Sequence, residues 1–262
     1  MITNTLTIAG TDCTGGAGIQ ADIKAISANG SYAMSVITAV VAQNTQRVQR
    51  IQMMPIDMIR AQIDSVFCDV EVDAVKIGML GNAEVIQCVA DALKTYKPSK
   101  VVLDPVMVAK SGDRLLDSEA VAALRDILLP QVGLITPNLP EAADLLGVTE
   151  ASNREQMLEQ AKRLTVPTFL KGGHLSGEQD SPDLLYVTDN YRWFEGKRIA
   201  TKNSHGTGCT LSAAIATFWG QGDSLEQACD KAKQYLTSAL SKADTLNVGQ
   251  GHGPVHHFYQ YY

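Results

Sequence analysis

The stretch Gly206-Thr207-Gly208-Cys209 has the residue types of an anion site at the start of a helix. The first four backbone N–H groups of a helix have no partner within it, and the helix dipole places partial positive charge there. The two glycines let a phosphate approach the backbone closely. Cys209 lies among these donors, where a thiol is acidified. The stretch therefore indicates a phosphate site, although a glycine-rich loop before a tightly packed helix has the same pattern.

A second glycine-rich segment, residues 9–22, supplies tight turns and backbone donors and then starts a helix with Asp22 in its second turn. Further along, Gln43 and Asn44 end a long apolar run. Side-chain amides there suit a polar heterocycle, which needs paired donors and acceptors. Amides that merely cap the end of a strand would give the same pattern.

Oxygen-bearing side chains end two further apolar runs. Asp104 closes one run, and Asn138 and Glu141 follow the next. Hard oxygen ligands at the ends of neighbouring strands suit Mg²⁺ held through water, as in nucleotide sites. Asn138 and Glu141 could instead form a helix capping pair. Lys171 follows another apolar run and is a compact charge suited to a phosphate, although most lysines are simply solvated.

Composition narrows the class of protein. The chain has 262 residues, a formal net charge of −6 and a sequence pI of about 5.4, which argues against nucleic acid as a partner. We expect a cytoplasmic protein without a membrane partner, because no apolar run reaches spanning length and residues 1–10 lack the regions of a signal peptide. The five scattered cysteines argue against a disulfide framework or a structural zinc site.

Short β-branched runs alternate with amphipathic segments, which is typical of a mainly parallel sheet covered by helices on both faces. We expect strands at residues 6–9, 35–42, 74–77, 100–104, 133–136 and 168–171, and an antiparallel edge hairpin from 184–187 and 192–194. Helices are expected at residues 16–29, 56–69, 82–96, 118–129, 153–164, 207–219 and 224–242.

No long linker or internal repeat interrupts the chain, so residues 1–262 are expected to form one domain. The glycine- and histidine-rich residues 249–257 lack acidic partners for a metal, and we expect a surface loop there. Ligands of open α/β sheets bind outside the carboxyl ends of the strands, so the glycine-rich segments and the polar strand ends should meet there.

In this combination and order, the motifs resemble those of the hydroxymethylpyrimidine/phosphomethylpyrimidine kinases of thiamine biosynthesis, within the ribokinase-like superfamily. The resemblance runs nearly end to end and implies a three-layer αβα sandwich with a mainly parallel central sheet and an antiparallel edge hairpin. It is carried by residues 9–12, 15–22, 41–45, 76–80, 102–107, 111–113, 135–141, 171–174 and 201–210.

The resemblance implies an enzyme that uses ATP and Mg²⁺ to phosphorylate 4-amino-5-hydroxymethyl-2-methylpyrimidine, and then the resulting monophosphate, at one site. Carried onto this sequence, Gln43 would read the aminopyrimidine edge. The rest of the substrate pocket would be formed by Asp22, Gly10, Met79 and Val106. Since relatives are often dimers, the resemblance also implies a homodimer.

On the phosphate side, the resemblance assigns the transferred phosphoryl group to Gly206, Thr207 and Gly208, and the ATP phosphates to Lys171. Cys209 falls where many relatives in the superfamily place an aspartate base. It would act either as the base of the first step or through its backbone N–H. The magnesium shell would be formed by Asp104, Asn138 and Glu141.

Two departures from the family pattern bear on the substrate. Cys13 replaces a proline beside the substrate loop, and Ala109-Lys110 stands where some pyridoxal-phosphorylating relatives carry a second cysteine before Ser111-Gly112-Asp113. The pyrimidine is therefore the preferred substrate, and a pyridoxal or pyridoxine kinase is the alternative.

Two further alternatives belong to other functional classes. Residues 16–21 match the G-x-G-x-x-A fingerprint of a dinucleotide-dependent oxidoreductase, but Gln43-Asn44 stands where the ribose-binding acid is expected. A non-catalytic metabolite-binding protein would need the pocket, but it would not need Lys171, the acidic pair and the anion site together.

Overall fold

A mostly parallel sheet of eight strands forms the centre of the computed structural model, which describes residues 1–108, 116–173, 175 and 180–262. The strand order is β10-β9-β8-β7-β6-β5-β1-β2. Within these residues, β9 runs antiparallel to both β8 and β10, and the other neighbouring pairs are parallel. The strands are β1 Asn4–Ala9, β2 Tyr32–Ile37, β5 Ala74–Ile77, β6 Val101–Leu103, β7 Leu134–Ile135, β8 Thr168–Lys171, β9 Asp183–Val187 and β10 Asn190–Phe194.

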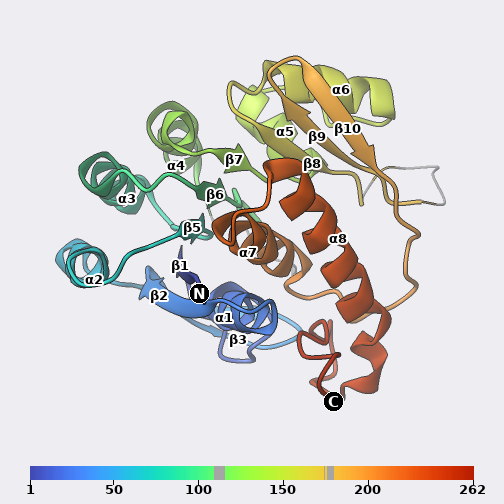
Figure 1. Cartoon of the computed structure of the whole chain (residues 1–262), viewed down its shortest axis with the longest axis horizontal. Coiled ribbons are helices and arrows are strands. Elements are labelled where there is room, and N and C mark those ends of the chain that lie inside the picture. Colours follow the sequence, from blue (N-terminus) through green and yellow to red (C-terminus); the bar gives the residue numbers. More distant parts are fainter. Residues whose placement is uncertain (109–115, 174, 176–179) are drawn as a thin grey trace.

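Helices cover both faces of this sheet (Figure 1). One layer contains α1, α7 and α8, and α2, α3 and α4 lie on the opposite face. The pair α5 and α6 packs on β8 and β9. The helices are α1 Gly18–Ala28, α2 Ile56–Phe67, α3 Ala83–Tyr96, α4 Ser118–Ala123, α5 Leu139–Leu146, α6 Arg154–Arg163, α7 Thr207–Gly220 and α8 Leu225–Ser241. The predicted αβα fold class with its edge hairpin is confirmed.

The small residues of helix α7 allow it to pack between the sheet and two other helices. It packs against α1, α8, β5 and β6, and it is buried on nearly all sides. Alanine, serine and glycine keep the helix close to its neighbours, which brings its first turn to the carboxyl ends of the central strands. The predicted range 207–219 matches the observed helix within one residue.

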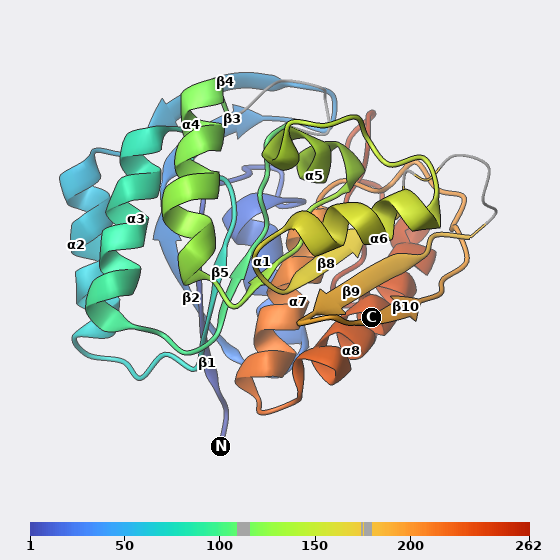
Figure 2. The same ribbon diagram turned by 90° about the horizontal axis from the view of Figure 1, so that it is seen from above.

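The expected single strand 35–42 is wrong, because the chain leaves the main sheet at Thr38. Its N–H donates to Ala9 O at 3.0 Å, and its hydroxyl donates to Met79 O at 2.8 Å. The residues beyond it form β3, Ala39–Gln43, which pairs with β4, Val48–Met53, in a separate antiparallel two-stranded sheet. Figure 2 shows this hairpin apart from the central strands.

Three other segments differ from the predicted elements. The helix expected at 118–129 ends its α-helical part at Ala123 and continues through a π-type turn, Leu124–Leu128, into a 3₁₀ turn. Helix α5 was not predicted as an element. The expected surface loop at 249–257 is wrong in its second half, because residues 253–257 are buried.

Two kinds of feature are absent from the described parts of the chain. No helix there has both the length and the apolar character needed to cross a membrane. Among the described residues, no group of three or more histidine, cysteine or acidic side chains is arranged to hold a metal ion on its own.

Candidate active site

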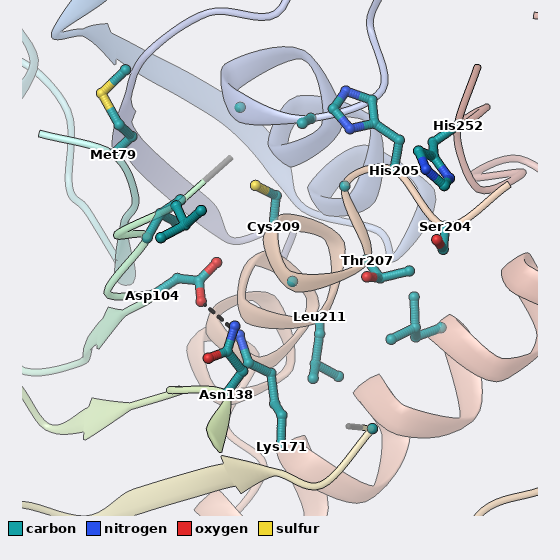
Figure 3. A pocket seen from close by; sticks show the side chains of 18 of the residues that line it. Met79, Asp104, Asn138, Lys171, Ser204, His205, Thr207, Cys209, Leu211 and His252 are labelled. Atoms are coloured by element: carbon teal, nitrogen blue, oxygen red, sulfur yellow. Dashed lines mark hydrogen bonds and ion pairs between the residues drawn. The ribbon is translucent and has the colours of Figure 1, made fainter. Parts of the chain in front are cut away.

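A cavity of about 850 Å³ lies at the carboxyl ends of the central strands (Figure 3). Its walls come from the β1–α1 loop, the β3–β4 hairpin, the ends of β5 to β8 and the first turn of α7. Of the predicted site residues, those that line the cavity are Gly10, Gln43, Met79, Asp104, Val106, Asn138, Glu141, Lys171, Gly206, Thr207, Gly208 and Cys209.

The first turn of α7 has the geometry of an anion site. Gly206 precedes the helix with a φ of 76°, and a Cβ atom at this position would lie 1.7 Å from Gly16 O. Only glycine fits there. A Cβ atom at Gly208 would lie 3.3 Å from Lys171 Nζ and 3.4 Å from Asp104 Oδ2. The backbone of the first turn therefore faces the charged groups at the strand ends.

Lys171 places a cation beside the first turn of α7, and its side chain is only 15% exposed. Its Nζ lies 3.0 Å from Asp104 Oδ1 and 3.8 Å from Glu141 Oε2. Burial opposes the charge of Lys171, but Asp104 and Glu141 raise its pKa. The ammonium is therefore charged at neutral pH, beside the first turn of α7.

Glu141 is a buried carboxyl group whose pKa lies near neutral pH. Burial raises its pKa to about 7, Lys171 opposes this rise, and Asp104 adds to it. One pKa unit corresponds to only about 1.4 kcal/mol, so a modest attraction to a cation bound nearby would be enough to ionise this group.

The helix capping pair that the sequence left open is present. Asn138 Oδ1 accepts the Glu141 N–H at 2.8 Å, and Glu141 Oε2 accepts the Asn138 N–H at 2.7 Å. This reciprocal box starts α5 and fixes both side chains at the edge of the cavity. Both groups retain oxygen lone pairs that can accept hydrogen bonds from metal-bound water.

The expectation of an acidified Cys209 thiol is wrong for this protein. Burial raises its pKa to about 11, which outweighs the lowering by Lys76 and the backbone of Gly18. The helix terminus supplies partial charge, but the loss of water around the sulfur is the larger effect. Figure 3 shows the Cys209 side chain directed into the same space as Asp104.

Gln43 lies on the β3–β4 hairpin, is half-buried and lines the cavity. Gly10, Met79 and Val106 come from the ends of β1, β5 and β6. This half of the cavity combines the apolar side chains of Met79 and Val106 with the amides of Gln43 and Asn44, the two amides that the sequence predicts for a heterocycle.

Asp22 is absent from the cavity wall. Its side chain is fully buried and accepts hydrogen bonds from Lys76 Nζ at 2.8 and 2.9 Å and from the Thr7 hydroxyl at 2.6 Å. Lys76 contributes to the wall instead. The predicted contact between Asp22 and a substrate is therefore wrong. Asp22 instead holds Lys76, which lines the cavity.

Two further features are not indicated by the sequence patterns: an apolar part of the cavity wall and a polar pair. The apolar part is formed by Leu211, Leu236, Leu240 and Ile199. The pair is Asp12 and His205, whose Oδ2 and Nε2 atoms lie 2.7 Å apart. No local signal could have found this pair, because the two residues are 193 positions apart.

Comparisons with known proteins agree with this geometry. Residues 12–256 match the phosphomethylpyrimidine kinase family. The hydroxymethylpyrimidine/phosphomethylpyrimidine kinase of Escherichia coli K12 is 53% identical over 263 residues, covering 99% of this chain and 98% of that protein.

Solved structures of related kinases superpose on this chain. A Bacillus subtilis pyridoxal kinase in complex with ADP superposes with a TM-score of 0.92 at 34% identity, covering 99% of both chains. A phosphomethylpyrimidine kinase from Clostridium difficile 630 gives a TM-score of 0.81 at 40% identity, covering 90% of this chain and 99% of that chain. The sequence motifs, the cavity and these matches together establish that the chain belongs to the phosphomethylpyrimidine kinase family.

Proposed function

We propose that this protein transfers the γ-phosphoryl group of ATP to the hydroxymethyl oxygen of 4-amino-5-hydroxymethyl-2-methylpyrimidine, and then a second one to the monophosphate. In each step an O–P bond forms to the acceptor and the bond to ADP breaks. One observation carries the proposal: Lys171 and Asp104 meet the first turn of α7 in the cavity that Gln43 also lines.

The half of the cavity around Gln43 suits the acceptor ring. An amide offers one donor and one acceptor, which match the ring nitrogen and amino group of an aminopyrimidine. Met79 and Val106 supply apolar contacts for the ring and its methyl group. The kinases of Escherichia coli and Rhizobium meliloti, 53% and 48% identical to this chain, carry both pyrimidine activities in their names.

The other half of the cavity holds the phosphates. Phosphoryl transfer has a loose transition state, so positioning and charge stabilisation supply most of the rate. The backbone N–H groups of residues 207–209 face the transferred group, and Lys171 balances its charge. The ADP in the Bacillus subtilis pyridoxal kinase structure supports nucleotide binding in this fold.

The residues at the strand ends fit a magnesium ion that is held through water and phosphate oxygens. Their donors are hard oxygens, and the described residues contain no three-ligand cluster that would bind the ion directly. Asp104, Asn138 and Glu141 would hold it from the protein side. When bound, the ion would neutralise charge on the phosphates.

Pyridoxal phosphorylation is the second candidate function, because a pyridoxal kinase superposes over 99% of this chain. Ala109-Lys110 and Ser111-Gly112-Asp113, which bear on this choice, lie outside the described residues, as does residue 174. The family match disfavours the oxidoreductase and the metabolite-binding protein. The cytoplasmic location, the homodimer and the single domain stay predictions.

A panel of acceptors tests the proposal. The protein would be incubated with ATP, Mg²⁺ and, in turn, the pyrimidine alcohol, its monophosphate, pyridoxal, pyridoxine and a simple sugar. We expect the pyrimidine to gain one and then two phosphoryl groups by mass spectrometry. Lys171→Ala, purified identically, controls for contaminating kinases and should lose turnover. A higher kcat/KM for pyridoxal than for the pyrimidine would replace the first proposal with the second.

A further inference from the structure

Asp12 organises the glycine-rich β1–α1 loop from within. Its carboxylate is fully buried and accepts hydrogen bonds from Thr14 N at 2.9 Å, the Thr14 hydroxyl at 2.8 Å, Gly16 N at 3.1 Å and Ala17 N at 2.8 Å. Burial opposes ionisation, but the hydrogen bonds from His205 and Thr14 hold the pKa of Asp12 well below its usual range. The loop therefore folds around a fixed negative charge.

His205 supplies a further donor to this carboxylate, and it comes from the opposite end of the chain. Its Nε2 lies 2.7 Å from Asp12 Oδ2. Because an ionised carboxylate only accepts hydrogen bonds, Nε2 must carry a proton. The backbone N–H of His205 donates to Gly253 O at 3.0 Å, which fixes the residue from a second direction. His205 directly precedes the first turn of α7 in sequence.

The backbones of the two loops touch beside this hydrogen bond. A Cβ atom at Gly16 would lie 2.6 Å from His205 Cδ2, and one at Gly206 would lie 1.7 Å from Gly16 O. Since side chains at these positions would push the loops apart, glycine at both positions allows their direct contact. Figure 3 shows His205 beside the start of α7, next to the β1–α1 segment.

Each of the two loops lines a different half of the cavity. The β1–α1 loop contributes Gly10, Thr11 and Ala17, and its Thr11 N–H donates to Ala39 O of the β3–β4 hairpin at 2.9 Å, whereas residues 206–209 form the anion site. The relative position of these loops therefore sets the distance between an acceptor hydroxyl and the phosphoryl group that it attacks. Misplacement by about 1 Å costs on the order of 10²-fold in rate.

We propose that Asp12 and His205 are positioning residues for phosphoryl transfer, which lock the substrate loop to the anion site through the Asp12–His205 hydrogen bond. The inference rests on the proposed function for its catalytic readout. Asp12 does not line the cavity, and His205, which does, has its Nε2 occupied by the hydrogen bond to Asp12. Their effect should therefore appear in kcat rather than in the affinity for either substrate.

Three variants separate positioning from general stability. His205→Ala removes the donor, and His205→Gln keeps an N–H donor of similar reach without the imidazole. Ile63→Ala serves as a destabilised control, because Ile63 is fully buried in α2 and absent from the cavity wall. For each variant, kcat and both KM values would be measured at a temperature well below its Tm.

We expect His205→Ala to lose about 10²-fold in kcat, with both KM values within about threefold of wild type. His205→Gln should recover kcat to within about tenfold of wild type, and Ile63→Ala should keep a wild-type kcat. The proposal is overturned if His205→Ala keeps its kcat, if it loses no more than Ile63→Ala, or if His205→Gln is as slow as His205→Ala.

Amide hydrogen exchange tests the loop contact without any acceptor. In His205→Ala, the amides of Gly16 and Ala17 should exchange at least about tenfold faster, together with those of residues 207–209, and Ile63→Ala should show no such local change. Acceleration in only one loop contradicts the coupling. If the wild-type protein phosphorylated no pyrimidine, the proposed function would fail while this measurement still decided the role of the pair.

Discussion

Asp22 and Lys76, which lines the cavity, form an ion pair in which neither side chain is exposed to solvent. Their Oδ2 and Nζ atoms lie 2.8 Å apart. Burial opposes the charge of Lys76, but Asp22 raises its pKa, so the cation persists in the cavity wall. The pair joins α1 to β5, and its ammonium also lowers the pKa of the Cys209 thiol against the effect of burial.

We predict that Lys76→Met destabilises the protein by about 3–5 kcal/mol, because it leaves the buried carboxylate of Asp22 without its partner. The double variant Asp22→Asn/Lys76→Met should recover much of this loss, since an amide can still accept the hydrogen bond from Thr7. Urea unfolding of the wild type, both single variants and the double variant gives the coupling free energy. Additive losses would show that the two charges do not depend on each other.

This pair illustrates what the sequence could predict. The sequence predicts Asp22 as a residue of the substrate pocket, but its side chain pairs with Lys76, which is 54 positions away and is not indicated by any local pattern. The ends of β1, β5, β6 and β8 and the start of α7 were predictable, because apolar runs, glycines and polar strand ends are local features. The sequence therefore placed most of the cavity wall and left its supporting contacts unknown.

The hairpin that carries Gln43 was missed for a related reason. Residues 35–42 are an unbroken run of mostly apolar, β-branched residues that reads as one strand. The break at Thr38 depends on its hydrogen bonds to Ala9 and Met79, which are distant in sequence. The pKa of Cys209 depends likewise on burial, which a helix-terminus argument cannot supply. Tertiary contacts outweighed the local pattern in both cases.

Cys209→Ala is predicted to lose about 10²-fold in the first phosphorylation and less in the second, because the second acceptor is already an anionic phosphate. The variant keeps the backbone donor of the anion site. Only the thiolate accepts a proton, and the pKa of the thiol is about 11, so the wild-type first-step rate should rise from pH 7 towards pH 10.

Single-turnover rates for each step, measured across this pH range, check the role of Cys209. The rise of the first-step rate with pH should disappear in Cys209→Ala. The rate of the second step should not depend on pH in either protein. Equal losses in both steps would instead assign the whole effect to the shape of the anion site.

For Gln43→Ala, we predict weaker binding of the pyrimidine by about 1–3 kcal/mol with little change for ATP, because the polar edge of the ring loses its partner. Isothermal titration calorimetry with each ligand separates the two effects. Val40→Ala is a matched control on the same hairpin, since Val40 is 51% exposed and absent from the cavity wall. Unchanged pyrimidine affinity combined with weaker ATP binding would show that the Gln43 half of the cavity does not hold the acceptor.

Glu141 and Lys171 lie 3.8 Å apart, yet their removal should have different consequences. Glu141→Ala should raise the Mg²⁺ concentration needed for half-maximal rate without abolishing pyrimidine binding, because an ion held mainly through water and phosphates loses one outer support. Lys171→Ala should lower the rate at every Mg²⁺ concentration, because a missing phosphate donor differs from a missing metal support. Magnesium titrations of the ADP-release rate distinguish these outcomes. Full rescue of Lys171→Ala by excess Mg²⁺, or an unchanged Mg²⁺ dependence in Glu141→Ala, would contradict this division of roles.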